Sequence, residues 1–273
     1  MLLELTIFWS IGVPTEIEHL NFLRVMFMSI LKKLAKRANC KSTGGGKWAS
    51  HHAAQKMKER LNSMLAPDSV PIFIGIDARY GLRKNRRGIG NYLYHLLCEF
   101  QRLMPEGFRF ILYADRTADP AVTARFQGDP FAVRVLPAPN FAWWEQVALP
   151  LAARRDGVDL LHCTSNIAPV IFKPCRLVTT IHDVIEFRRR EFGDTKLSLR
   201  HRLSRAYRMG VLPRVARLSD CIITVSEFSR QDIAAVLNVQ PEKIKTIYNA
   251  TSREKNGRNP ERAKRLKELG INE

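Results

Sequence analysis

The sequence lacks the paired cysteines of a disulfide framework or a structural zinc site. Its cysteines are odd in number, scattered, and never arranged as Cys-x-x-Cys; they are Cys40, Cys98, Cys163, Cys175 and Cys221. Such usage is typical of a protein in a reducing cytoplasm. We therefore expect no structural zinc site. No bound cofactor is expected either.

Long apolar runs are also missing. No run reaches the roughly 18–20 residues that a membrane-spanning helix needs. The apolar start, Met1 to Val13, is short, carries Glu4, and lacks the basic region and cleavage site of a signal peptide. The sequence therefore predicts a cytoplasmic protein without a membrane span.

Acidic residues are scarce relative to basic ones. Lys and Arg number 44 against 26 Asp and Glu, a formal net charge of +18. Such a chain is drawn to polyanions, including nucleic acid, anionic lipid and phosphorylated ligands. No zinc finger, RNA-recognition motif or other nucleic-acid motif is present, so we expect no specific nucleic-acid partner.

Residues 1–70 differ in character from the rest of the chain. Leu20 to Ala38 has the pattern of a basic amphipathic helix, and a glycine-rich linker, Lys41 to Lys47, follows it. A polar helix is predicted from His51 to Leu65. Two interpretations stay open. The segment is either a membrane-surface helix that holds the protein at the inner face of an anionic membrane, or a poorly packed extension that arises from a start codon assigned too early.

From residue 71 to about residue 250, short apolar runs alternate with helical patterns, which indicates an α/β fold with a Rossmann-like parallel sheet and helices on both faces. The predicted strands are Ile72–Asp77, Phe108–Tyr113, Ala132–Leu136, Asp159–His162, Arg176–Ile181, Cys221–Val225 and Ile244–Tyr248. The predicted helices are Gly90–Leu103, Trp144–Arg155, Leu197–Leu218 and Glu227–Leu237.

Ligands of an open parallel sheet bind beyond the carboxyl ends of its strands. The first such end leads into Arg87, Gly88 and Gly90, where a glycine-rich turn opens a helix and could bind an anion. Leu93 stands where the third glycine of a dinucleotide fingerprint belongs, so this is not that motif. The alternative is a flexible basic loop whose glycines serve only the turn.

Three further strand ends carry polar side chains. Ser165 and Asn166 could bind sugar hydroxyls, or could satisfy the backbone of their own loop. His182 could donate a hydrogen bond or move a proton, with Asp183 beside it. In the alternative interpretation, Asp183 caps the next turn, and His182 only lines the site and makes its hydrogen bonds within the protein. Ser226 is placed to cap the following helix, whose N-terminus is a further possible anion site.

Taken in order, six segments resemble the N-terminal domain of family-4 glycosyltransferases. They are GIDAR (residues 75–79), RGIGNY (87–92), DLLHCTSN (159–166), TTIHDV (179–184), ITVSEFSRQDI (223–233) and PEKIKTIYNA (241–250). No single segment is decisive, but their order and spacing together are specific, and the resemblance spans about Ile72 to Ala250.

The resemblance implies a retaining, generally metal-independent glycosyltransferase with two facing Rossmann-like domains, the GT-B architecture. The expected donor is a nucleotide sugar such as GDP-mannose, and the acceptor a lipid-linked or polysaccharide sugar. By position, Gly88 and Gly90 would lie near the donor diphosphate. Arg87 could help to stabilise the negative charge of that diphosphate. His182 would lie beside the transferred sugar, and Ser165 and Asn166 would line the acceptor side.

The resemblance ends where a second domain would begin. Residues 251–273 are mostly charged and too few to build the donor-binding domain with its paired glutamates. We therefore expect a truncated or split enzyme with weak or no activity alone. The alternative is a non-catalytic module that docks on a membrane surface.

Overall fold

The structure is a computed structural model that describes residues 71–103, 107–188, 199–249 and 268. The helices predicted from Leu20 to Ala38 and from His51 to Leu65 lie outside these residues. The membrane-surface interpretation of residues 1–70 therefore stays a prediction. Of residues 251–273, only Glu268 is described.

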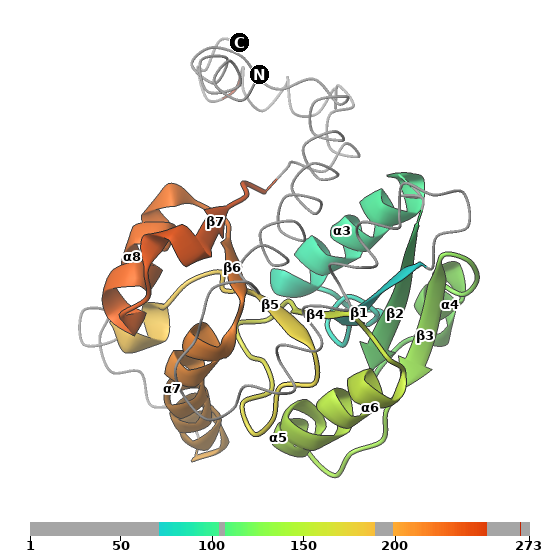
Figure 1. Ribbon diagram of the computed structural model, residues 1–273, viewed down its shortest axis with the longest axis horizontal. Helices are drawn as coiled ribbons and strands as arrows, with labels where there is room; N and C mark the ends of the chain where they lie inside the picture. Colours follow the sequence, from blue (N-terminus) through green and yellow to red (C-terminus); the bar gives the residue numbers. More distant parts are fainter. Residues whose placement is uncertain (1–70, 104–106, 189–198, 250–267, 269–273) are drawn as a thin grey trace.

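Seven parallel strands form one sheet in the order β3-β2-β1-β4-β5-β6-β7 (Figure 1). All seven predicted strands are confirmed, each end within two residues. The strands are β1 Ile72–Asp77, β2 Phe108–Ala114, β3 Phe131–Val135, β4 Leu160–Cys163, β5 Arg176–Thr180, β6 Cys221–Thr224 and β7 Ile244–Thr246.

The four predicted helices are also present. The helices are α3 Ile89–Leu103, α4 Pro120–Arg125, α5 Phe141–Trp143, α6 Leu149–Arg155, α7 Leu199–Leu218 and α8 Glu227–Leu237. The additions are α4 and the short α5, which precedes one of the predicted helices. The short α4 was not predicted; it has no buried residue, so no apolar stripe marks it. The helix predicted over Trp144–Arg155 begins earlier, as α5, and passes through a π-helical turn, Trp144–Ala148, before α6.

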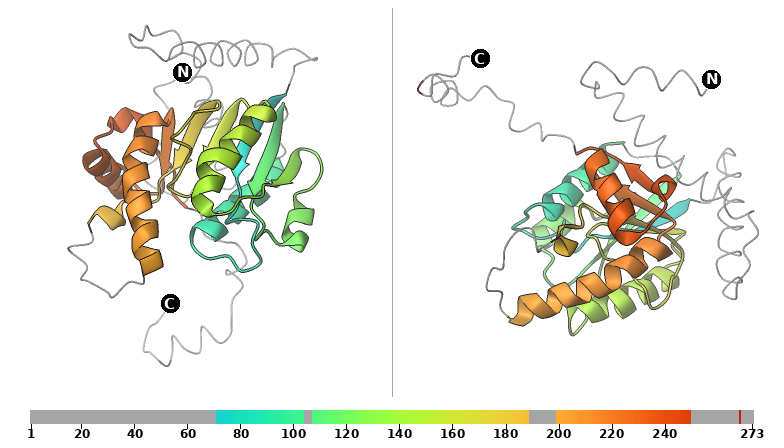
Figure 2. Two further views of the ribbon diagram at one scale, coloured as in Figure 1. Left: turned by 90° about the horizontal axis from the view of Figure 1, so that it is seen from below. Right: turned by 90° about the vertical axis from the view of Figure 1, so that its left-hand side faces the viewer.

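Two hydrophobic cores lie on opposite faces of the sheet. On one face, Ile74 and Ile76 of β1 pack with Leu93 and Leu97 of α3. The other core joins strand residues to buried residues of α6, α7 and α8; it includes Leu161, Leu177, Ile222, Ala153, Val215 and Ile233. The helices therefore cover both faces (Figures 1 and 2), which confirms the predicted Rossmann-like fold class.

The strand order reverses direction at β1, which pairs with β2 on one side and with β4 on the other. In doubly wound sheets the ligand crevice lies at this reversal, beyond the carboxyl ends of the strands. The segments that follow β1 and β4 are therefore the first place to look for a site. Within the described ranges, no helix is long and apolar enough to cross a membrane.

Candidate functional site

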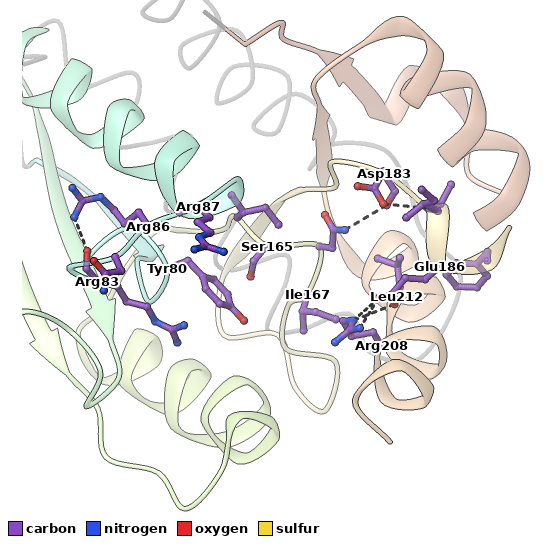
Figure 3. A pocket seen from close by; sticks show the side chains of 17 residues that line it. Tyr80, Arg83, Arg86, Arg87, Ser165, Ile167, Asp183, Glu186, Arg208 and Leu212 are labelled. Carbon is purple, nitrogen blue, oxygen red and sulfur yellow. Dashed lines mark hydrogen bonds and ion pairs between the residues drawn. The ribbon is translucent and has the colours of Figure 1, made fainter. Parts of the chain in front are cut away.

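A pocket of about 600 Å³ opens at the reversal point of the sheet (Figure 3). It is formed by the segments that follow β1, β4 and β5 and by one side of α7. Five of the residues predicted for the site line it together: Arg87, Gly90, Ser165, Asn166 and Asp183. Gly88 and His182 are sequence neighbours of lining residues. Ser226 is not among the lining residues, and its hydroxyl accepts a hydrogen bond from the backbone N–H of Ser229, the predicted helix cap.

The glycines before α3 are set by backbone geometry. Gly88 has φ +45°, in the left-handed region that favours glycine. A Cβ on Gly90 would lie 2.7 Å from the carbonyl oxygen of Tyr80. The glycines thus do serve the turn, and the close approach also brings the first turn of α3 to the pocket wall. The positive end of the α3 dipole therefore faces the pocket, with no acidic residue in its first turn.

Replacing Gly90 by alanine is expected to destabilise the protein by about 1–3 kcal/mol, because the new methyl must displace backbone. The matched control is Gly210→Ala, in α7, where a Cβ meets nothing within 4 Å. That change should stabilise by about 0.5–1 kcal/mol, since alanine is the better helix former. Urea unfolding of both variants measures the difference. Equal free energies of unfolding would contradict the close approach at Gly90.

Four arginines line the pocket, and three are already engaged. Arg83 pairs with Asp115 at 3.5 Å. Arg86 donates to the Arg83 carbonyl at 2.5 Å, and Arg208 donates through Nε to Glu186 at 2.9 Å. In contrast, the exposed side chain of Arg87 has no hydrogen bond or ion pair within the described part of the chain. Arg87 is therefore the pocket cation that is free to bind an anionic ligand.

Ser165 and Asn166 reach the pocket from the end of β4. Asn166 has φ +63°, and its Oδ1 accepts a hydrogen bond of 2.8 Å from the backbone N–H of His182. Asn166 thus satisfies backbone of its own loop region. Ser165 differs, because it is only 9% exposed and its Oγ has no partner among the described residues. A buried hydroxyl without a partner at a pocket wall is a candidate ligand contact.

Asp183 contacts both its own loop and the pocket. Its Oδ1 accepts a hydrogen bond of 3.2 Å from the backbone N–H of Ile185, where the short 3-10 turn Ile185–Phe187 begins, although the N-cap residue of that turn is Val184. The residue also lines the pocket. Its neighbour His182 is held from two sides: its Nε2 lies 3.1 Å from the carbonyl oxygen of Thr164, and its ring meets Tyr92 edge-on at 5.0 Å.

The protonation of His182 follows from these contacts. A carbonyl oxygen only accepts hydrogen bonds, so Nε2 must carry the hydrogen. Burial lowers the pKa of His182, although the Thr164 carbonyl opposes this. The ring is therefore neutral at pH 7, with Nδ1 as the nitrogen that lacks a hydrogen. Behind it, His162 bonds Thr180 through Nε2 at 2.9 Å. Burial, with His182 nearby, lowers the pKa of His162 to about 4.

A buried ionic cluster beneath the pocket was not predicted. Arg79 donates to Asp77 at 2.8 Å and to Glu145 at 2.9 Å, and all three side chains are at most 5% exposed. The Arg79 guanidinium lies 4.0 Å from the centre of the Trp144 ring. Tyr207 of α7 donates to the second oxygen of Glu145 at 3.1 Å. The cluster thereby ties the end of β1 to the π-helical turn and to α7.

Burial raises the pKa of Glu145, and the neighbouring Arg79 opposes this. Burial disfavours the charge on Arg79 too, but Asp77 and Glu145 outweigh it and raise the pKa of Arg79. Arg79 therefore stays charged. Because two carboxylates surround one guanidinium, the stability of the cluster depends on that single cation.

Within the described ranges, no three His, Cys, Asp or Glu side chains are placed to hold a metal ion. The described cysteines, Cys98, Cys163, Cys175 and Cys221, are free thiols.

A family model described as Glycosyltransferase Family 4 matches residues 86–255, which is more than half of the chain. The chain belongs to glycosyltransferase family 4. This confirms the family predicted from the six ordered segments, and the matched region contains most of the pocket. A search of the curated proteins finds no match.

Several solved structures are similar to this chain over about half of their own length. An Anabaena protein, Alr3699/HepE, in complex with UDP is 17% identical, with 73% of this chain and 50% of that chain covered and a TM-score of 0.46. A glycosyltransferase from Rickettsia africae is 13% identical over 74% and 50%, with a TM-score of 0.37. The wall teichoic acid polymerase TagF, as its H548A variant, is 12% identical over 84% and 47%, with a TM-score of 0.36. This chain thus spans about half the length of the structures it matches.

Proposed function

We propose that this domain is one half of a retaining GT-B glycosyltransferase. It would move a sugar from a nucleotide-sugar donor, GDP-mannose in the first instance, to a lipid-linked or polysaccharide acceptor. The observation that carries the proposal is the convergence of a free arginine, a helix N-terminus and an unpaired hydroxyl in one pocket of a family-4 domain.

The pocket's charge suits the leaving group of such a reaction. Breaking the bond between a sugar and a nucleoside diphosphate leaves negative charge on the diphosphate. Fixed cations and backbone N–H groups stabilise that charge without a proton transfer. Arg87 and the first turn of α3 supply both kinds of group on one wall of the pocket.

Other lining residues of the pocket suit a sugar. In this proposal, Ser165 Oγ and the Asn166 amide bind acceptor hydroxyls, and Asp183 adds a carboxylate beside them. His182 is the candidate catalytic residue next to the transferred sugar. Its neutral ring is oriented by the Thr164 carbonyl. The predicted contact of Ser226 with an anion stays a prediction apart from its capping role.

The binding part of the proposal is tested by titrating GDP-mannose, UDP-glucose and GDP into the full chain by calorimetry. Arg87→Gln is expected to weaken binding by about tenfold, because a hydrogen bond to a charged group contributes about 1.5–3 kcal/mol. The control is Arg214→Gln, an exposed arginine of α7 away from the pocket. Equal weakening by both changes, or no binding of any nucleotide, would overturn the proposal.

The catalytic part is tested by sugar transfer from labelled GDP-mannose, using the chain mixed with the C-terminal half of a family-4 enzyme. His182→Ala is expected to lower kcat roughly ten- to a hundredfold, the range for losing one or two positioned polar contacts. Nucleotide affinity should change little. Wild-type kcat in this variant would remove His182 from the mechanism.

A further inference from the structure

Tyr92 of α3 contacts His182, the candidate catalytic residue. The two rings stand edge to face, with centroids 5.0 Å apart and an angle of 88° between their planes. Tyr92 is partly buried and packs against the hydrophobic core that also contains Leu93 and Leu97 of the same helix. Packing of α3 onto the sheet therefore helps to hold the Tyr92 ring where it meets His182.

The hydroxyl of Tyr92 is held as well. It is hydrogen-bonded to the side chain of Thr180, the last residue of β5. Thr180 Oγ1 also lies 2.9 Å from His162 Nε2, and these two side chains are almost completely buried. Thr180 precedes His182 by two residues. The Tyr92 hydroxyl is thus tied to the strand end that leads into His182.

The backbone of Tyr92 belongs to the first turn of α3. Its N–H donates to the carbonyl oxygen of Gly88 at 3.0 Å, which closes that turn. The neighbouring residues Arg87 and Gly90 line the pocket. Tyr92 therefore connects the turn whose positive dipole end faces the pocket to the ring of His182.

His182 has two further contacts, and only one of them acts on its ring. Its backbone N–H donates to Asn166 Oδ1 at 2.8 Å, and its Nε2 lies 3.1 Å from the Thr164 carbonyl oxygen. Among the described residues, a single hydrogen bond thus orients the imidazole. A hydrogen bond and an edge-to-face aromatic pair contribute similar net free energies. The Tyr92 contact is therefore comparable in strength to the hydrogen bond that it accompanies.

We propose that Tyr92 is a positioning residue, which holds the ring of His182 in one orientation relative to the first turn of α3. In the proposed function, that turn receives the donor diphosphate and His182 lies beside the transferred sugar. Because the sugar and its diphosphate are covalently joined, the two protein groups must keep a fixed separation for the reaction. The catalytic consequence rests on the proposed function, whereas the positioning of the ring rests on the contacts of Tyr92.

Helix α3 offers a matched control for Tyr92. Tyr94 is also a partly buried tyrosine that packs against the same core, and its ring meets a histidine, His95, edge-on at 5.7 Å. The Tyr94 hydroxyl accepts a hydrogen bond from Arg125 at 2.6 Å. The test change is Tyr92→Leu and the control is Tyr94→Leu. A third variant, Tyr92→Phe, keeps the ring and removes only the hydroxyl.

The first experiment is nitrogen-15 NMR of the full chain with labelled histidine, at pH 8, where a histidine of ordinary pKa is neutral. His182→Ala identifies the His182 signals. We expect one tautomer in the wild type, with the hydrogen on Nε2. Tyr92→Leu should move the two ring nitrogen shifts toward each other, because water then competes with the Thr164 carbonyl and both tautomers are populated. Tyr92→Phe and Tyr94→Leu should give the wild-type shifts.

The second experiment measures sugar transfer from labelled GDP-mannose by the chain mixed with the C-terminal half of a family-4 enzyme. Tyr92→Leu is expected to lower kcat about two- to tenfold, the effect of losing one contact of this strength. The KM for GDP-mannose should change less than about twofold, since the backbone bond to Gly88 remains. Tyr92→Phe should keep most of the wild-type kcat. In a His182→Ala background, Tyr92→Leu should have no further effect, because a residue that acts through His182 then has nothing to position.

Unchanged His182 shifts in Tyr92→Leu would overturn the proposal. Equal changes in Tyr92→Leu and Tyr94→Leu would overturn it too, by assigning the effect to the packing of α3. So would a loss of kcat that persists in the His182→Ala background.

The wild type alone also tests the contact between the two rings. An Overhauser effect between the ring protons of Tyr92 and His182 is expected at a centroid distance of 5.0 Å, and its absence would contradict the proposal. If the wild type binds no nucleotide and transfers no sugar, the proposed function fails. The NMR results then still decide whether Tyr92 holds the ring.

Discussion

Arg79→Met is expected to lower the free energy of unfolding by about 3–5 kcal/mol. Arg79 is the one cation between two buried carboxylates, Asp77 and Glu145. Removing it leaves two negative charges facing each other in a region that water does not reach. Methionine keeps much of the side-chain volume, so the loss reports charge rather than a cavity.

Urea unfolding at neutral pH measures this effect. The control is Arg102→Met, which breaks an exposed pair with Glu99 in α3 and should change stability by less than about 1 kcal/mol. Adding Asp77→Asn and Glu145→Gln to Arg79→Met should restore part of the lost stability, because the uncompensated charges disappear. A similar small loss for the Arg79 and Arg102 variants would contradict a buried, single-cation cluster.

The cluster matters for the site because of what it connects. Tyr80, the residue after Arg79, lines the pocket, and Ser165 follows Thr164, whose hydroxyl donates to the Asp77 carbonyl at 3.0 Å. Disturbing Arg79 therefore acts on two of the segments that line the pocket. Glu145 lies in the π-helical turn and contacts Arg79, and such turns are frequent at functional sites.

Local sequence pattern was enough for the fold of the described region. Each strand is a short apolar run bounded by polar or glycine-containing turns, so all seven were found. What was missed leaves little trace in local sequence. Helix α4 is a short surface helix without a buried residue. The π-helical turn adds one residue to a helix, and this addition does not visibly change the spacing of the apolar residues in the sequence.

The site was predictable where it depends on strand ends. Arg87, Ser165 and Asp183 were named because parallel strands bring the segments after them to one edge. The ionic cluster was not named, since Glu145 lies 66 residues from Arg79 and inside a helical pattern. The charged ending of β1, Asp-Ala-Arg, was its only local signal. Arg208 and Glu186 were missed likewise, because long charged side chains on a helix or turn usually face solvent.

His162 should make the protein sensitive to acid. In the folded protein its pKa is about 4, against an ordinary value of 6.5, because the ring is buried. Between these two pH values the unfolded chain binds a proton that the folded chain does not. Stability must therefore fall as pH falls from 6.5 to about 4, by about 3 kcal/mol at 1.36 kcal/mol per pKa unit.

Urea unfolding at several pH values between 7 and 4 measures this loss. His162→Gln keeps a polar group near Thr180 but cannot be protonated in this range, so its stability should fall by about 3 kcal/mol less than that of the wild type. The control, His95→Gln, lies at an exposed position of α3 and should follow the wild-type curve. Parallel curves for the wild type and His162→Gln would show that His162 is protonated in the folded protein as easily as in the unfolded chain. In that case the buried His162 and Thr180 pair would have to be open to water.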